Sequence, residues 1–84
     1  MIPTKQFKRD IKKHFIELIT PQWIEVMNCL IHDVEPPERY QNHPLKGDKS
    51  GLWDCHIKPD LVLLYEKSEH FLILHRLATH SELF

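Results

Sequence analysis

Apolar residues in the first third of the chain recur with helical spacing. We expect a helix from Lys5 to about Leu18, with Thr4 as its N-cap. One apolar stripe on this helix is formed by Phe7, Ile11, Phe15 and Leu18. Its other faces are basic and carry Lys5, Lys8, Arg9, Lys12 and Lys13.

A second helix is predicted to start at Thr20-Pro21, because threonine caps helices well and proline is favoured at the first helical position. Its apolar residues are Trp23, Ile24, Met27, Leu30 and Ile31. It should end near His32 or Asp33, ahead of Pro36-Pro37. Two helices joined by a short turn predict a helical hairpin.

The pattern changes from helical to extended after the prolines. Residues 40–51 are polar and contain both glycines, which is typical of a loop. Residues 53–57 alternate, with Asp54 and His56 on the face opposite the apolar residues. Residues 61–65 are apolar throughout, as in a central strand covered on both faces, and a third strand is expected over residues 71–77. We therefore predict an α+β fold with the helical hairpin packed on a small antiparallel sheet.

Composition limits what this chain can be. Its 84 residues suit one domain spanning the whole chain, and 42% apolar residues with a net charge of −1 argue against disorder. The longest apolar run, Leu61–Tyr65, is far short of the roughly 20 residues that span a bilayer. No secretory signal is visible, and we interpret Cys29 and Cys55 as free thiols in a reducing cytoplasm.

Seven histidines in 84 residues suggest acid–base chemistry, because imidazole titrates near neutral pH. His56 ends the first predicted strand, Asp60 opens the second, and Arg76 and His80 follow at the end of the third. These positions share one end of an antiparallel meander, so their side chains can converge there. Strand alternation places His75 on the face opposite Arg76.

Such a set of residues suits RNA cleavage by the RNA's own 2′-hydroxyl. That reaction needs a base, an acid for the 5′-oxygen and a cation for the phosphorane, but no metal. Each residue also has an ordinary interpretation as a turn former or a solvated charge. The spacings of the histidines and cysteines match no zinc site.

Three blocks of sequence carry a resemblance to a known family. They are Asn42–Gly47 (NHPLKG), Gly51–Asp60 (GLWDCHIKPD) and Arg76–Phe84 (RLATHSELF). Together they are similar to the HPLxG, GxxxxHxxPD and RxxxHSxLF patterns of the YafQ toxins, within the RelE/ParE superfamily of type II toxin–antitoxin systems. The basic start of the chain is also similar to the family's first helix.

The resemblance implies an endoribonuclease that cuts mRNA in the ribosomal A site without cofactor or metal. It implies an acid–base set formed by His43, His56, Asp60 and His80. Arg76 matches the transition-state cation, Phe84 matches an aromatic that holds the scissile nucleotide, and Lys46 and Lys58 are expected to bind substrate. His80 is the expected acid, and the base is left open between Asp60, His56 and His43. The implied partners are the ribosome, mRNA and a DinJ- or RelB-like ribbon-helix-helix antitoxin, through which the complex binds operator DNA.

The chain departs from the family pattern at its start, where only Met1–Thr4 remain for a short N-terminal edge strand. Leu61 and Trp53 stand where the family often has tryptophan and a basic residue. Two other functions are open: a ParE-like toxin that inhibits a protein target and cleaves nothing, and a small regulatory subunit with surface histidines. A complete acid–base set together with Arg76 favours the nuclease.

Overall fold

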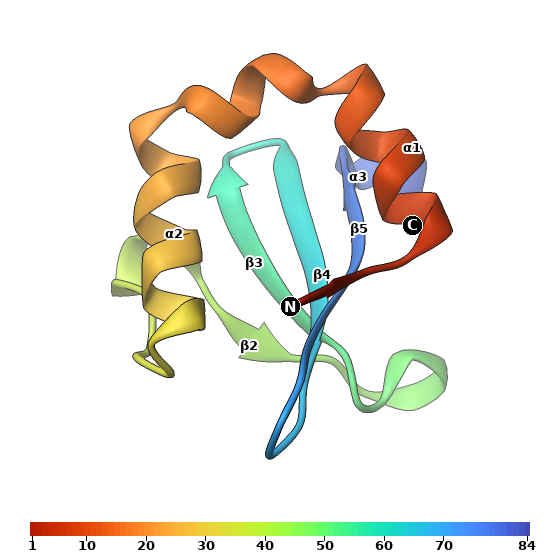
Figure 1. The fold of residues 1–84 in the computed structure, drawn as a ribbon. Helices are drawn as coiled ribbons and strands as arrows, with labels where there is room; N and C mark the ends of the chain where they lie inside the picture. Colours follow the sequence, from red (N-terminus) through yellow and green to blue (C-terminus); the bar gives the residue numbers. More distant parts are fainter.

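The computed structural model describes all 84 residues, which form a five-stranded sheet and its covering helices (Figure 1). In chain order the elements are β1 (Ile2–Pro3), α1 (Lys5–Lys13), the 3-10 helix η1 (Phe15–Ile19), α2 (Pro21–Ile31), η2 (Glu38–Tyr40), β2 (His43–Pro44), η3 (Gly47–Lys49), β3 (Trp53–Lys58), β4 (Leu61–Lys67), β5 (Leu72–Ala78) and α3 (His80–Leu83). No helix is both long enough and apolar enough to cross a membrane.

The sheet has the strand order β1-β5-β4-β3-β2. The antiparallel meander of β3, β4 and β5 confirms the three predicted strands. The expected N-terminal edge strand is β1, which pairs in parallel with β5 through Ile2 and Ile73. β2 lies within the segment predicted as a loop, and it pairs His43 with Asp54 of β3. Two residues are too few to give an alternating pattern, so the sequence did not indicate this strand.

The first helix is shorter than predicted. It begins at Lys5, where the Thr4 hydroxyl accepts a hydrogen bond from the Phe7 amide at 3.0 Å, but it ends at Lys13 rather than Leu18. The chain continues as η1, whose tighter winding breaks the spacing of the apolar stripe. Phe15 is consequently turned to solvent and 65% exposed.

The two long helices do not form the expected hairpin. α2 has the predicted bounds and the predicted Thr20 cap, but the five-residue η1 separates it from α1. Both helices cover the same face of the sheet, α1 along β5 and α2 over β3 (Figure 1). They meet through Phe7 and Trp23, whose ring centroids are 6.3 Å apart.

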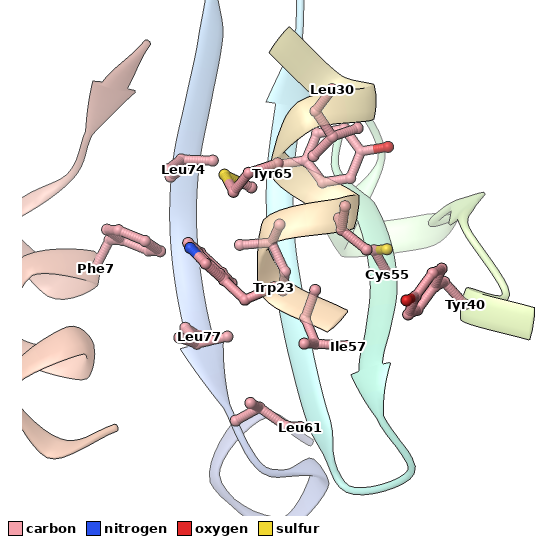
Figure 2. Close-up of a cluster of buried hydrophobic side chains, with 13 residues drawn as sticks. Phe7, Trp23, Leu30, Tyr40, Cys55, Ile57, Leu61, Tyr65, Leu74 and Leu77 are labelled. Atoms are coloured by element: carbon pink, nitrogen blue, oxygen red, sulfur yellow. The ribbon is translucent and has the colours of Figure 1, made fainter. Parts of the chain in front are cut away.

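A core of 13 buried residues fills the space between these helices and the sheet (Figure 2). β4 lies at its centre and is buried from Leu61 to Tyr65, as predicted for a strand covered on both faces. Leu63 and Tyr65 belong to this core, whereas Val62 and Leu64 are buried on the opposite face. We call that opposite face the outer face.

The C-terminal segment covers the outer face. α3 folds back behind β5 (Figure 1), and its Leu83 shares a pocket with Leu64. Thr79 and Glu82 form a capping box at the start of α3. The Glu82 carboxylate also pairs with Lys13 and lies 3.4 Å from His14 Nε2, so the end of α1 holds α3 in place.

The predicted position of His75, on the face opposite Arg76, is wrong because β5 contains a β-bulge. Leu64 pairs with Arg76 but Tyr65 pairs with Leu74, so His75 is an extra residue in β5. His75 therefore lies on the outer face with Arg76 rather than opposite it, and both line one pocket. Its Nε2 is 3.1 Å from the Glu66 carboxylate.

The core predicts different responses at two isoleucines. Ile57→Ala should lower the free energy of unfolding by about 2–5 kcal/mol, because Ile57 is 2% exposed. The matched change Ile24→Ala, at a helix residue that is 58% exposed, should alter it by less than about 0.5 kcal/mol. Urea denaturation of both variants measures the difference, and similar losses would contradict this assignment of the core.

The contact of Glu82 with α1 predicts a pH-dependent stability. The hydrogen bond from Lys13, supported by that from the Thr79 amide, lowers the pKa of Glu82 from 4.5 to about 2. A carboxylate with a lowered pKa stabilises the fold above its unfolded pKa and loses that effect as the pH falls through its folded pKa. Thermal melts should therefore separate wild type from Glu82→Gln above pH 4.5 and converge toward pH 2. A constant difference across this range would contradict the ion pair.

Candidate active site

Three histidines lie together at one end of the outer face. The ring centroid of His56 is 5.1 Å from that of His80 and 6.4 Å from that of His43. The Phe84 ring is 6.1 Å from His80. Residues from β2, β3 and the C-terminal segment thus form one cluster.

Strand pairing explains why His43 and His56 are neighbours. β2 places His43 opposite Asp54 on β3, and His56 lies two residues further along β3 on the same face. The residue before His43 is anchored to the core, because the Tyr65 hydroxyl donates a hydrogen bond to the Asn42 side chain. The position of His43 is therefore fixed from both sides.

Asp60 joins the cluster through His80. It lies in the turn between β3 and β4, and its Oδ1 accepts a hydrogen bond from the His80 amide at 3.2 Å. The same oxygen is 3.5 Å from His80 Nδ1. Asp60 therefore orients both the backbone and the ring of His80.

The tautomer of His43 follows from its hydrogen bond. Its Nδ1 lies 2.7 Å from the carbonyl oxygen of Gln41, which can only accept a hydrogen bond. Gln41 has a left-handed backbone conformation, with φ of 48°. When the ring is neutral, its proton is thus on Nδ1 and the lone pair is on Nε2. The side chain is 52% exposed, so His43 can accept a proton from a bound substrate.

Asp54 is a site residue that the sequence did not single out. It is 5% exposed, and its Oδ1 lies 3.1 Å from His43 Nδ1 and 3.8 Å from His56 Nε2. The proton on His43 Nδ1 points to Gln41, so this buried oxygen has no protein hydrogen-bond donor. Alternation placed Asp54 beside His56, but its burial depends on β2, which the sequence did not reveal.

Arg76 does not join the histidine cluster. It is on the outer face as expected, but its guanidinium binds Asp10 of α1 through Nε at 2.8 Å and Nη2 at 3.3 Å. These hydrogen bonds raise the pKa of Arg76. Burial raises the pKa of Asp10, but the hydrogen bonds from Arg76, Leu77 and Gln6 outweigh it, and the pKa is lowered.

The expected substrate-binding residues differ in their surroundings. Phe84 is exposed, and Lys49 Nζ lies 5.6 Å from the centre of its ring. Lys46 makes no ion pair, whereas Lys58 is held by Glu17 of η1 at 2.6 Å. Lys49 ends η3, in the segment predicted as a loop, where no pattern distinguishes one lysine from another.

The cluster contains the groups that acid–base catalysis requires. His43 has a half-exposed ring with its lone pair on Nε2, and the His80 ring lies beside the Asp60 carboxylate. An open pocket of about 580 Å³ adjoins His56, and another of about 380 Å³ adjoins Arg76 and Lys49. No group of three or more histidine, cysteine, aspartate or glutamate side chains has a metal-binding arrangement.

Comparison with known proteins gives consistent matches. The family model described as "Bacterial toxin of type II toxin-antitoxin system, YafQ" matches residues 1–84. The mRNA interferase toxin YafQ of Escherichia coli strain K12 is 38% identical over 60 residues, which cover 70% of this chain and 65% of that protein.

Solved structures agree with the sequence matches. A copper-bound mutant toxin from Helicobacter pylori superposes with a TM-score of 0.89 at 36% identity, covering 99% of this chain and 96% of that one. A chain of the E. coli DinJ–YafQ complex gives 0.85 at 29% identity, covering 99% and 94%. Since the family model spans every element of the fold and the three sequence blocks contain the clustered histidines, this chain belongs to the YafQ family of toxins of bacterial type II toxin–antitoxin systems.

Proposed function

We propose that this chain is an endoribonuclease that cuts mRNA in the ribosomal A site without a metal. The observation that carries the proposal is the gathering of His43, His56 and His80 on one surface, where the ring centroid of His56 lies 6.4 Å from that of His43 and 5.1 Å from that of His80. Family membership and the name of the E. coli relative, an mRNA interferase, support it.

The proposed reaction is a transfer within the RNA. An imidazole takes the proton of the 2′-hydroxyl, and the 2′-oxygen attacks the adjacent phosphorus. The bond from phosphorus to the 5′-oxygen breaks, and His80 gives a proton to this oxygen. The products are a 2′,3′-cyclic phosphate and a 5′-hydroxyl, and Arg76 offsets the negative charge of the phosphorane.

The contacts of Asp60 favour an imidazole as the base. The Asp60 carboxylate is engaged with the amide and ring of His80, which makes it a positioning residue for the acid. His43 has its lone pair on Nε2 of a half-exposed ring, and His56 lies between His43 and His80. We therefore assign the base to the His43–His56 pair, with Asp54 beside both rings to stabilise the positive charge that forms.

The remaining residues bind the substrate. Phe84 offers an exposed ring on which the scissile nucleotide can stack, with His80 beside it. Lys46 and Lys58 contribute positive charge near the strands that carry His43 and His56. The ribosome supplies the orientation of mRNA that a domain of 84 residues cannot supply alone.

The partner that neutralises the toxin is a ribbon-helix-helix antitoxin, whose complex with this chain binds operator DNA. The DinJ–YafQ complex of E. coli supports the part of this proposal that concerns an antitoxin partner. Four cations of α1 make no ion pair within the chain: Lys5, Lys8, Arg9 and Lys12. They continue into the exposed Phe15, Ile16 and Ile19 of η1, so a partner with acidic and apolar side chains fits this surface.

One prediction from the proposed function concerns the substrate. Purified protein should cleave mRNA on translating ribosomes and leave the same mRNA largely intact without them, because the ribosome provides the orientation. Primer extension on both samples detects the cuts. Rapid cleavage of naked mRNA would contradict the ribosome requirement, and no cleavage in either sample would contradict the nuclease assignment.

Another prediction concerns the acid. His80→Ala should lower single-turnover cleavage by roughly 10²–10⁴-fold, while ribosome binding changes much less, because proton donation matters only in the transition state. His80→Gln should not restore activity, since an amide cannot deliver a proton at neutral pH. The matched control is His70→Ala, in the exposed loop between β4 and β5. Equal losses at both positions would refute the assignment.

A further inference from the structure

Asp10 is the one acidic residue of the basic helix α1, and it is turned inward. It is 6% exposed. Its carboxylate accepts four hydrogen bonds: from Arg76 Nε at 2.8 Å, Arg76 Nη2 at 3.3 Å, the Leu77 amide at 3.0 Å and Gln6 Nε2 at 3.2 Å. Nothing in the reaction proposed above uses this residue.

The location of Asp10 follows from the short first strand. β1 pairs only with Ile73 and Leu74, which leaves the rest of the β5 edge without a neighbouring strand. Beyond β1, α1 supplies the acceptor that a neighbouring strand would have supplied: the Asp10 carboxylate accepts a hydrogen bond from the Leu77 amide. A buried amide without an acceptor is costly, so a hydrogen-bond acceptor is required here.

Asp10 also binds Arg76, although one acceptor for the Leu77 amide would be enough for the β5 edge. A guanidinium has five N–H donors in one plane, and Asp10 takes one on Nε and one on Nη2. The other three, on Nη1 and Nη2, have no partner in the chain and form the edge that can bind a phosphate with two hydrogen bonds. Asp10 thus fixes the plane and direction of a free guanidinium edge.

The pocket beside Arg76 is lined by basic side chains. Lys49 and His75 line it with Arg76, and no carboxylate does. Lys49 also contacts the Phe84 ring, which connects this pocket to the histidine cluster. The proposed reaction needs a phosphate at Arg76, and this pocket is the space beside it.

We propose that Asp10 is a positioning residue that acts on RNA cleavage through Arg76. It holds the guanidinium so that its free edge meets the phosphate, and it is not itself in contact with RNA. This inference rests on the proposed endoribonuclease function. The competing explanation is that Asp10 only ties α1 to β5, and in that case its effect does not depend on Arg76.

A double-mutant cycle separates these explanations. Arg76→Ala should lower single-turnover cleavage on ribosomes by about 10²–10³-fold, as for loss of one transition-state donor. Asp10→Asn keeps the shape and the oxygen that accepts from both the Leu77 amide and Arg76 Nε, but it loses the negative charge and the acceptor for Arg76 Nη2. It should lower cleavage by about tenfold. In the Arg76→Ala background, Asp10→Asn should have no further effect. A further tenfold loss in the double variant would overturn the proposal.

Two checks keep the result interpretable. Asp33→Asn is a matched change at an exposed aspartate just beyond the end of α2, and it should leave cleavage unchanged. Where Asp10→Asn proves unstable at the assay temperature, Asp10→Glu keeps the charge but displaces the carboxylate by one methylene. Its loss of activity must likewise vanish when residue 76 is alanine, and a persistent loss counts against the proposal.

A measurement without RNA distinguishes failure of this inference from failure of the proposed function. In the free protein, the Arg76 Nε–H resonance should be protected from solvent exchange in wild type and exposed in Asp10→Ala, which removes the oxygen that accepts this hydrogen bond. Equal protection in both would overturn the positioning role whatever the activity. Loss of protection together with a wild type that does not cleave on ribosomes would instead refute the nuclease and leave the tie between Asp10 and Arg76 established.

Discussion

Burial of β4 on both faces is the constraint on which the rest of this structure depends. Leu63 and Tyr65 face α1 and α2, but Val62 and Leu64 need a second cover. The two amphipathic helices are already used on the first face. The outer face is therefore closed by the last residues of the chain, and this closure brings His80 over His56. The candidate site is a consequence of completing the core.

The elements that could be predicted from sequence are those with strong local signals. Thr20-Pro21 fixes the start of α2, and alternation or continuous apolar character identifies β3 and β4. The missed features depend on partners elsewhere in the chain. The apolar pattern over five residues does not distinguish the 3-10 helix η1 from a continuing α-helix. β2 forms only because it pairs with β3. The bulge at His75 depends on the register between β4 and β5.

The same division applies to the site. His56, Asp60 and His80 could be placed together because a meander brings strand ends to one side, and the resemblance added His43 and Phe84. Asp10 and Asp54 could not be selected, because a carboxylate in a polar segment is ordinarily solvated. Their burial arises from α1 meeting β5 and from β2 covering β3. Arg76 was assigned to the correct strand end, but its contact with Asp10 depends on a helix 66 residues earlier.

The two buried carboxylates, Asp10 and Asp54, differ in their hydrogen bonds. Asp10 is surrounded by donors, so its charge is compensated in the resting protein. Asp54 has one oxygen without a protein donor, although two imidazoles lie within 3.8 Å. An uncompensated buried charge is costly, and a positive charge on either ring reduces that cost. The proton that leaves the 2′-hydroxyl in the proposed reaction produces this positive charge. One buried aspartate is thus paired with the Arg76 cation in the resting protein, and in the proposed reaction the charge of the other would be offset only after a neighbouring imidazole has taken a proton.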